Sequence, residues 1–571
     1  EGRQKIMDLK NIIAAIALSA AVIVLYGLFF APTQEEIDNL SQNENKKEEI
    51  INNMDAPSIE ENVPDNVISR DDAIKESSRI FFENEFIKGS ISLTGGAIDD
   101  LELKIYNQTL DSKDKIQLLN PISTNKGYTF NTGWATKSGI ETPNSKTVWK
   151  IDGSNKLTTN NPIKIYFENN SGIRFERIIS IDEKYLFNIR QVLINKSEKS
   201  IKFYPYAIIN RNNLPSDLTD FYILHEGYTL ISDEKLEEVD YDDVIEKKYS
   251  SEGTSGMLIQ GDKYWMTSII PEQGRKFRFD LDYKDKYRAS YIDLKGYETR
   301  SNSVVEHSVN SLIGAKEINQ INRYKEELKI EKLDLIVNYG VLYFIIVPMH
   351  KILSYFFNFT GNYGYAIILL TILVRIVFFP LNQYSMKSMG KMKSLGPEIE
   401  NLKSRFKDDK QQLQKEMMKL YKVNGVNPAS SCFPILIQIP IFFSLYKLLL
   451  LDLAMRHSPF IWVWQDLSAK DPLTIFNLFG LLPFGVPSFL EIGLLPVLMG
   501  SSMWLQMKLS PQPSGSDDMQ KMQKKIFMFM PLFLTVILAP FAAGLILYWV
   551  CTNILTIIQQ YIINKSITVK S

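Results

Sequence analysis

Residues 361–380 read GNYGYAIILLTILVRIVFFP, an apolar run that contains a single charged side chain, Arg375. A helix of about 20 apolar residues crosses the hydrocarbon of a bilayer, which is about 30 Å thick. The stretch therefore predicts a membrane span. An arginine at the centre of such a helix costs about 2.5–3.5 kcal/mol on insertion scales, so we expect a compensating environment around Arg375.

Further uncharged stretches predict five more spans in the 571-residue chain. The stretch 11–32 has basic residues before it and no clear small-residue cleavage site after it, so we interpret it as an uncleaved anchor. The run 526–563 would extend about 57 Å as one helix, almost twice the hydrocarbon thickness. The sequence Ala539–Gly544, which includes Pro540, predicts a break there and therefore a hairpin of two spans.

Lysine and arginine residues predict the orientation of these spans. Ten basic residues lie between 387 and 422 and four between 508 and 525, whereas the loop 452–491 contains only Arg456 and Lys470. Because positively charged loops stay in the cytoplasm, both termini are predicted inside and the loop 452–491 outside. Its uncharged part, 473–490, is interrupted by glycine and proline and is expected at the outer interface, without an assigned role for 476–490.

The residues between the first two spans follow a different pattern. Residues 33–78 are rich in Asn, Glu, Asp and Lys, which is typical of a flexible tether. From 79 to 325, short runs alternate between apolar and polar residues, as in Phe277-Arg278-Phe279-Asp280-Leu281, and Gly, Asn and Asp clusters separate them. This alternation predicts a large antiparallel β-sandwich on the periplasmic side. The segment 326–360, with the short apolar run Leu335–Met349, predicts an interfacial amphipathic helix.

The basic loop after the second span predicts a cytoplasmic hairpin of two helices, because methionine, leucine and phenylalanine recur every three or four residues. Between 382 and 422, ten basic and five acidic residues give a net charge of +5. One interpretation is a solvated pair of helices that obeys the positive-inside rule. The other is a docking arm for ribosomal RNA, anionic lipid or emerging chains, with methionines that adapt to varied apolar partners. Its candidate docking residues are Lys387, Lys391, Lys393, Lys403, Arg405 and Lys407.

Composition argues against metal or cofactor chemistry. The two cysteines, Cys432 and Cys551, lie in apolar stretches, and the four histidines are scattered along the chain. Neither pattern predicts a disulfide framework or a metal site. The chain also lacks the glycine-rich loop that binds nucleotide phosphates. We therefore expect no cofactor, no metal and no enzyme activity.

Several motifs resemble those of the YidC/Oxa/Alb membrane protein insertases, in the Gram-negative YidC type. They are Thr371-Ile372-Leu373-Val374-Arg375, Pro380-Leu381, Val426-Asn427-Pro428, the run 432–442 (CFPILIQIPIF), Asp466-Leu467-Ser468 with Asp471-Pro472, Gly544-Leu545-Ile546-Leu547-Tyr548-Trp549, and Thr552-Asn553. The resemblance covers the whole chain and is most specific between 363 and 563.

The resemblance implies a chaperone and insertase that integrates nascent membrane proteins into the bacterial inner membrane, alone or with the Sec translocon. It implies a hydrophilic groove that is open to the cytoplasm and to lipid, with Arg375 as the groove arginine. The implied groove lining is Arg375, Thr371, Gln438, Ser431, Tyr548, Trp549 and Thr552. The implied partners are nascent substrates, the Sec translocon, the ribosome and membrane lipids.

The expected organisation is a six-span α-helical protein with both termini inside. Its parts are the stub and anchor 1–32, the linker 33–78, the β-sandwich 79–325, the interfacial helix 326–360, the second span 361–380, the hairpin 381–427, the third span 428–451, the outer loop 452–491, the fourth span 492–508, the loop 509–525, the fifth and sixth spans 526–563, and the tail 564–571.

Other readings of the same residues stay open from sequence. Arg375 lies five residues before Pro380, so its side chain could extend to the cytoplasmic headgroups instead of serving a groove. An ion-coupled transporter or channel is a second class of function, but no acidic residue lies inside a predicted span. An enzyme in the periplasmic domain is a third class, and a pair of carboxylates brought together by folding would support it.

Overall fold

The structure is a computed structural model that describes residues 68–568, apart from 216–217, 219–224, 234, 331, 338, 408, 427–432, 480, 483–485, 488–490 and 510–517. The expected anchor 11–32 and most of the tether lie outside the described residues. The end of the tether contains a short helix, α3 (Arg70–Lys75), which the sequence analysis missed. Ser69 caps this helix, because its hydroxyl accepts a hydrogen bond from the Asp72 amide. Arg70 forms an ion pair at 2.5 Å with Asp100 of the β-sandwich, which we call the strand domain.

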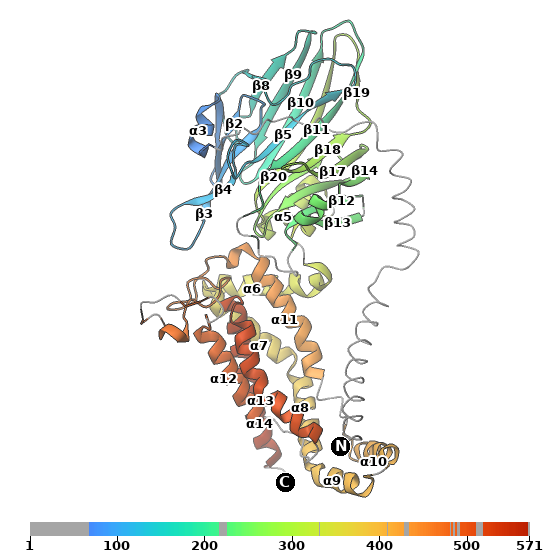
Figure 1. Ribbon diagram of the computed structural model, residues 1–571, viewed down its shortest axis with the longest axis vertical. Coiled ribbons are helices and arrows are strands. Elements are labelled where there is room, and N and C mark those ends of the chain that lie inside the picture. The colour runs from blue at the N-terminus through green and yellow to red at the C-terminus, as the bar shows by residue number, and fades with distance from the viewer. Residues whose placement is uncertain are drawn as a thin grey trace. The chain divides into compact units, whose positions relative to one another are not determined.

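Two sheets form the predicted β-sandwich, which is confirmed (Figure 1). The eleven-stranded sheet has the order β14-β17-β18-β11-β5-β3-β2-β1-β7, with β4 beside β3 and β19 beside β11. Its strands are β1 (Arg79–Glu83), β2 (Ile87–Ser92), β3 (Ile98–Asn107), β4 (Lys115–Leu119), β5 (Tyr128–Thr136), β7 (Lys156–Leu157), β11 (Ile201–Arg211), β14 (Tyr249–Gly253), β17 (Phe277–Tyr283), β18 (Tyr287–Asp293) and β19 (Tyr297–Thr299).

The nine-stranded sheet has the order β13-β12-β15-β16-β20-β10-β9-β8-β6. Its strands are β6 (Lys150–Ile151), β8 (Ile163–Glu168), β9 (Ile173–Ile181), β10 (Leu186–Asn195), β12 (Gly227–Ser232), β13 (Lys235–Asp240), β15 (Gly256–Gly261), β16 (Trp265–Pro271) and β20 (Ser303–Ala315). The short helix α4 (Tyr241–Glu246) follows β13. The sheets depart from the antiparallel prediction at one point, where β1 and β7 pair in parallel.

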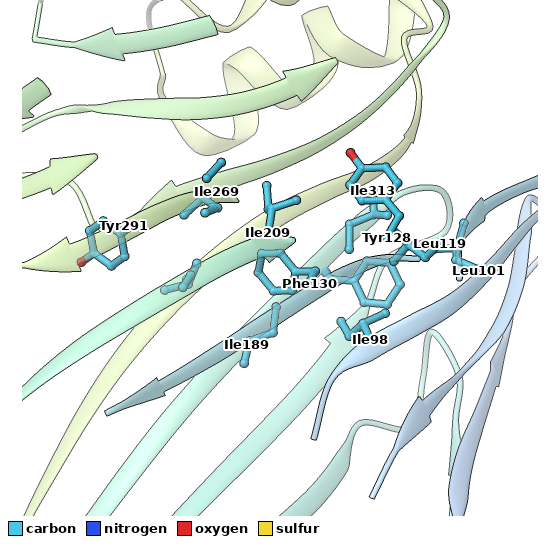
Figure 2. Close-up of a cluster of buried hydrophobic side chains, with 14 of the residues drawn as sticks. Ile98, Leu101, Leu119, Tyr128, Phe130, Ile189, Ile209, Ile269, Tyr291 and Ile313 are labelled. Atoms are coloured by element: carbon cyan, nitrogen blue, oxygen red, sulfur yellow. The ribbon is translucent and has the colours of Figure 1, made fainter. Parts of the chain in front are cut away.

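Alternation along the strands builds the core between the sheets. In β9, Ile173, Phe175, Ile179 and Ile181 are buried, as expected for one face of a strand. Figure 2 shows the same cluster drawing side chains from both sheets: Phe130 and Ile209 from the eleven-stranded sheet, Ile189 and Ile313 from the nine-stranded one. Burying each large apolar side chain contributes about 1.5–3 kcal/mol.

Arg177 occupies an inward position of β9, between the apolar residues. Its Nη1 donates to the Gly96 carbonyl at 2.7 Å and to Asn131 Oδ1 at 3.0 Å, and its guanidinium lies over the Trp149 ring. Asn131 belongs to β5, in the opposite sheet. Burial lowers the pKa of this guanidinium to about 10, so it stays protonated at neutral pH. Arg177 therefore links the two sheets by charge-assisted hydrogen bonds.

Helices make up the rest of the described chain. They are α5 (Ile318–Leu328), α6 (Tyr343–Thr360), α7 (Tyr363–Val377), α8 (Phe379–Ser394), α9 (Gly396–Arg405), α10 (Lys410–Val423), α11 (Phe433–Leu451), α12 (Leu494–Leu509), α13 (Asp518–Leu538) and α14 (Ala543–Thr568), with 3-10 turns at Leu333–Ile336, Gly340–Leu342, Leu453–Met455 and Ile475–Asn477. The helix α14 packs against α7, α11 and α12.

Few of the described helices have the length and apolar character of a full membrane span. Residues Ala543–Ile563 of α14 meet both conditions, and Tyr363–Val377 with Phe379–Met392 meet them together as one bent pair. Leu436–Leu451 and Met528–Leu538 are shorter apolar helices. The helices α13 and α14 are separate, with the break after Leu538.

The bend between α7 and α8 amounts to 59° and lies next to Pro380. Proline lacks an amide hydrogen and clashes with the carbonyl four residues earlier, so a helix bends or ends there. At its other end, α7 begins at a side-chain cap, because Asn362 Oδ1 accepts from the amides of Gly364 at 2.9 Å and Tyr365 at 3.3 Å. These two features fix the length of α7 and so the height of Arg375 along it.

The loop between α11 and α12 caps two helices at their first turns. The amides of Ala543 and Gly544 donate to the carbonyls of Ala469 at 2.7 Å and Leu467 at 2.9 Å. These bonds give acceptors to two amides at the start of α14 that have none within the helix. The buried Asp471 carboxylate accepts from the Leu495 amide of α12 at 2.6 Å and from the Leu473 amide at 3.0 Å. A carboxylate at a helix N-terminus also interacts favourably with the helix dipole.

Candidate polar site between the helices

A small hollow lies between α7, α8 and α11, and Arg375 is part of its wall. The other lining residues are Val374, Phe378, Leu381, Asn382, Ile437, Gln438 and Ile441. Arg375 is half-buried, and no carboxylate of the described residues lies within 4.0 Å of its guanidinium. The hollow therefore combines an unpaired cation with two amide side chains in apolar surroundings.

A hydrogen bond extends this polar wall to α14. Gln438 Nε2 donates to the hydroxyl oxygen of Tyr548 at 2.7 Å. Tyr548 is 1% exposed, so its phenol is held inside the helices with the amide as partner. Trp549 is half-buried on the same helix and packs edge-on against Phe442 of α11, with ring centres 4.8 Å apart. The contacts of both residues join α14 to α11.

Polar residues continue along one face of α14. Tyr548, Thr552, Thr556 and Gln559 are spaced by four, four and three residues, which places them on one side of a helix, and all four are buried. The Thr556 hydroxyl donates to the Thr552 carbonyl at 2.7 Å. Gln559 Nε2 donates to the Phe379 carbonyl of α8 at 3.5 Å. The stripe therefore leads from the Gln438 contact towards the bend of α8.

The expected groove residues differ in what they contact. Arg375 and Gln438 line one hollow, and Tyr548 joins it through Gln438. Thr371 lies one turn before Arg375 but is fully buried, and its hydroxyl donates to the Ile367 carbonyl within α7 at 2.7 Å. Thr371 is thus used inside its own helix and does not line the hollow. Ser431 lies outside the described residues.

Two polar residues near the bend were missed by the sequence analysis. Asn382 is 7% exposed and lines the hollow from α8, and Gln559 contacts the start of the same helix. Helical spacing gave no signal for Asn382, because the bend between α7 and α8 separates it from Arg375.

The predicted two-helix hairpin consists of three helices, because Leu395 separates α8 from α9. Of the expected docking residues, Lys387, Lys391 and Lys393 lie on α8, Lys403 and Arg405 on α9, and Lys407 in the turn before α10. The side chains of Lys387, Lys391, Arg405 and Lys407 are exposed and that of Lys403 is half-buried. Apolar contacts hold α8, α9 and α10 together: Leu395, Ile399 and Val426 pack against Met392, Met417, Leu420 and Tyr421. Lys419 and Glu416 form an ion pair at 2.7 Å on the surface of α10.

Asp99 and Asp100 are adjacent carboxylates on β3 of the strand domain. Burial raises the pKa of the Asp99 carboxyl to about 6, while the ion pair with Arg79 acts in the opposite direction. Asp100 pairs with Arg70 and accepts a hydrogen bond from Ser90. Both carboxylates are thus engaged with neighbouring side chains of the fold. Among the described residues, no cluster of three His, Cys, Asp or Glu side chains could hold a metal ion.

Apolar helices with a cationic, polar hollow, joined to a large β-sandwich, define an integral membrane protein with an extramembrane domain. Two family profiles match the chain: "60Kd inner membrane protein" at residues 355–570 and "YidC periplasmic domain" at residues 79–352. The Membrane protein insertase YidC of Pelagibacter ubique is 49% identical over 99% of this chain and all of its own length. That of Methylobacterium nodulans is 35% identical over 99% of this chain and 96% of its own.

The chain belongs to the YidC family of membrane protein insertases. It inserts nascent membrane proteins into the bacterial inner membrane and carries its β-sandwich in the periplasm. Family membership thus decides between the insertase and the ion-coupled transporter. Among solved structures, an active YidC insertase covers 85% of this chain and 92% of its own, with 17% identity and a TM-score of 0.34.

Proposed function

We propose that insertion proceeds through a polar groove that opens to the cytoplasm and contains Arg375, Gln438 and Tyr548. The proposal rests on the surroundings of the Arg375 guanidinium. This half-buried cation has no carboxylate within ion-pair distance among the described residues, although the apolar wall around it makes an unpaired charge costly. Water and the polar groups of a passing substrate would supply the missing solvation.

The polar stripe of α14 supports a groove rather than an isolated polar residue. Gln438 and Asn382 lie on the wall with Arg375, and Tyr548, Thr552, Thr556 and Gln559 follow on α14. In hydrocarbon, each polar group without a partner costs several kcal/mol. Tyr548, Thr556 and Gln559 have hydrogen-bond partners inside the fold, whereas the buried Thr552 hydroxyl has none among the described residues, so water or a polar ligand would stabilise the row there.

This arrangement suggests a mechanism based on solvation. A nascent membrane protein must move a short hydrophilic segment across hydrocarbon, and a wet groove part-way across shortens that path. Arg375 pairs transiently with acidic groups of the segment. The apolar helix of the substrate then moves into lipid, and its burial in hydrocarbon drives release. No residue of the groove acts as a catalyst in this scheme.

The proposal includes the six-span arrangement with both termini in the cytoplasm. It rests on the uncharged stretches of the sequence and on the basic residues of the loops. In this arrangement the end of α8 forms a cytoplasmic arm with α9 and α10, and the exposed Lys391, Arg405 and Lys407 of this arm face anionic partners. We include the ribosome, anionic lipid and emerging chains as partners of this arm, and the Sec translocon as a partner of the whole insertase. The helix α6 would lie at the outer interface, because Phe344, Tyr355 and Phe359 are exposed on it.

The test is insertion of a small double-spanning protein into liposomes that contain the full chain. Arg375→Ala should lower the inserted fraction at least fivefold, whereas Arg375→Lys should retain most of it, because a positive charge is what the groove needs. Arg300→Ala is the matched control, since it removes an exposed arginine of the strand domain, outside both the groove and the arm. Equal activity of wild type and Arg375→Ala would refute the role of the charge and favour a side chain that extends to the headgroups.

A further inference from the structure

An exposed apolar knob lies in the loop between α11 and α12. We define the apolar knob as residues 475–479 with Leu481 and Leu482. Leu481 is 81% exposed and Leu478 is 53% exposed, and three further large side chains, Phe476, Phe479 and Leu482, are exposed beside them. Single exposed apolar residues are common on protein surfaces, but a contiguous group of five marks a binding surface.

The knob is a folded element, held by backbone hydrogen bonds. The Phe479 amide donates to the Thr474 carbonyl at 2.8 Å, and the Leu482 amide donates to the Asn477 carbonyl at 3.0 Å. Leu478 and Phe479 both adopt left-handed backbone conformations, with φ of 52° and 59°. Such conformations are unfavourable for residues with a side chain and persist where the surrounding structure imposes them. The fold therefore holds the apolar side chains of the knob outward.

Charged residues close the base of the knob. Lys470 and Glu491 form an ion pair across it, and the Ile475 amide donates to the Ile492 carbonyl at 3.1 Å. Between Asp471 and Glu491 the sequence contains no charged residue. The segment thus has a charged, closed base and an uncharged, apolar tip, which is the polarity of an element that crosses from water into an apolar phase.

The loop lies on the same side of the membrane as the strand domain. Arg456 Nη2 donates to the carbonyls of Asn107 at 2.7 Å and Gln108 at 2.9 Å, at the end of β3. The guanidinium of Arg456 also lies over the ring of Trp265. Since the strand domain is periplasmic, the loop that follows α11 is periplasmic as well.

We propose that the apolar knob inserts into the periplasmic leaflet of the inner membrane and binds lipid acyl chains there. The knob is continuous through its base with α12, an apolar helix, so the bilayer is its nearest apolar phase. The knob also lacks basic residues, so its partner is the hydrocarbon rather than an anionic headgroup. This proposal concerns a surface apart from the groove and does not depend on it.

A photoreactive amino acid tests the proposal when it replaces Leu481 in the full chain, reconstituted in nanodiscs of phosphatidylethanolamine and phosphatidylglycerol. Illumination followed by mass spectrometry should show lipid adducts at position 481. The same replacement at Val148, an exposed apolar residue of the strand domain, is the control. We expect at least fivefold more lipid adduct at 481 than at 148.

Three results would overturn the proposal. Equal lipid labelling at 481 and 148 would mean that the knob stays in water. Adducts of position 481 with a second copy of the chain would identify the knob as an interface between copies. Adducts with a co-reconstituted substrate instead of lipid would assign the knob to substrate contact. A second replacement at Leu478 should repeat the lipid labelling, because this side chain shares the tip of the knob.

Discussion

Replacement of Asp471 by alanine should destabilise the helices more than the loss of a surface charge would. The Asp471 carboxylate is 6% exposed and accepts from two backbone amides, Leu495 at 2.6 Å and Leu473 at 3.0 Å. Both amides belong to residues that are themselves buried. Alanine therefore leaves two amide hydrogens without acceptors at the junction of the outer loop and α12.

The expected cost follows from these contacts. Each buried donor left without a partner costs about 1–3 kcal/mol. The helix dipole adds about 0.3–1 kcal/mol for the lost carboxylate at the start of α12. Together the loss is about 2–5 kcal/mol, because water entering from the outer side offsets part of it. Asp471→Asn keeps one acceptor oxygen at similar volume, so its cost should be about half as large.

Thermal unfolding of the full chain in detergent, followed by tryptophan fluorescence, compares the stability of the wild type and these two variants. At about 2–4 °C per kcal/mol, Asp471→Ala should lower the Tm by about 5–15 °C, with Asp471→Asn between it and the wild type. Asp466→Ala is the control, because that carboxylate accepts from the nearby Ser468, lies 3.9 Å from His457 Nε2 and, among the described residues, accepts from no helix amide, so the Tm of this variant should fall less. An unchanged Tm for Asp471→Ala, or a lower Tm for Asn than for Ala, would refute the reasoning.

Two further predictions concern the strand domain and α7. The pKa of the Asp99 carboxyl is about 6 in the folded protein, above the ordinary value of about 3.9, so the folded state binds this proton more tightly than the unfolded state. The protonated carboxyl therefore stabilises the fold fully below pH 4, and this contribution is lost as the pH rises to 6. The free energy of urea unfolding of wild type relative to Asp99→Asn should therefore fall by about 3 kcal/mol between pH 3.5 and 7, and a pH-independent difference would contradict this. In α7, a Cβ at Gly364 would clash with the Phe460 ring, so Gly364→Ala should cost about 1–3 kcal/mol. Adding Phe460→Ala should cost less than the sum of both changes in the same thermal assay, whereas strict additivity would exclude the clash.

The sandwich could be predicted from the sequence because alternation is a local signal. In β9, every second residue from Ile173 to Ile181 faces the core, and this pattern is visible in the sequence alone. The partners of a strand are not local: β10 lies between β9 and β20, which begins more than 100 residues later in the chain. Arg177 also breaks the apolar pattern at an inward position, and only its acceptors on the opposite sheet explain its burial.

The candidate site was predicted where a polar residue contrasts with its neighbours. Arg375 is conspicuous because the surrounding stretch is uncharged. Asn382 was missed because it follows Pro380, where polar residues are common and carry little information. The family resemblance implied that Thr371 lines the groove, but it does not reveal that the Thr371 hydroxyl donates to the Ile367 carbonyl. Spacing predicts the face of the helix on which a residue lies, whereas hydrogen bonding within the helix decides whether its polar group is available to a ligand.

The sequence motif at Asp466–Asp471 gave no hint of its contacts, because these are made with distant helices. Asp471 binds an amide 24 residues later, and Leu467 accepts from Gly544. A motif of this kind shows that its residues matter without showing which helix they cap.

The start of α14 depends on backbone carbonyls at Leu467 and Ala469, and a carbonyl is present whatever the side chain. Point substitutions at these two positions can therefore leave the hydrogen bonds to the start of α14 intact. Insertion or deletion of one residue between them and Asp471 would instead shift the carbonyls out of register with the amides of Ala543 and Gly544. Among homologues, the number of residues from Leu467 to Asp471 should consequently stay constant, even where the side chain at Ala469 differs.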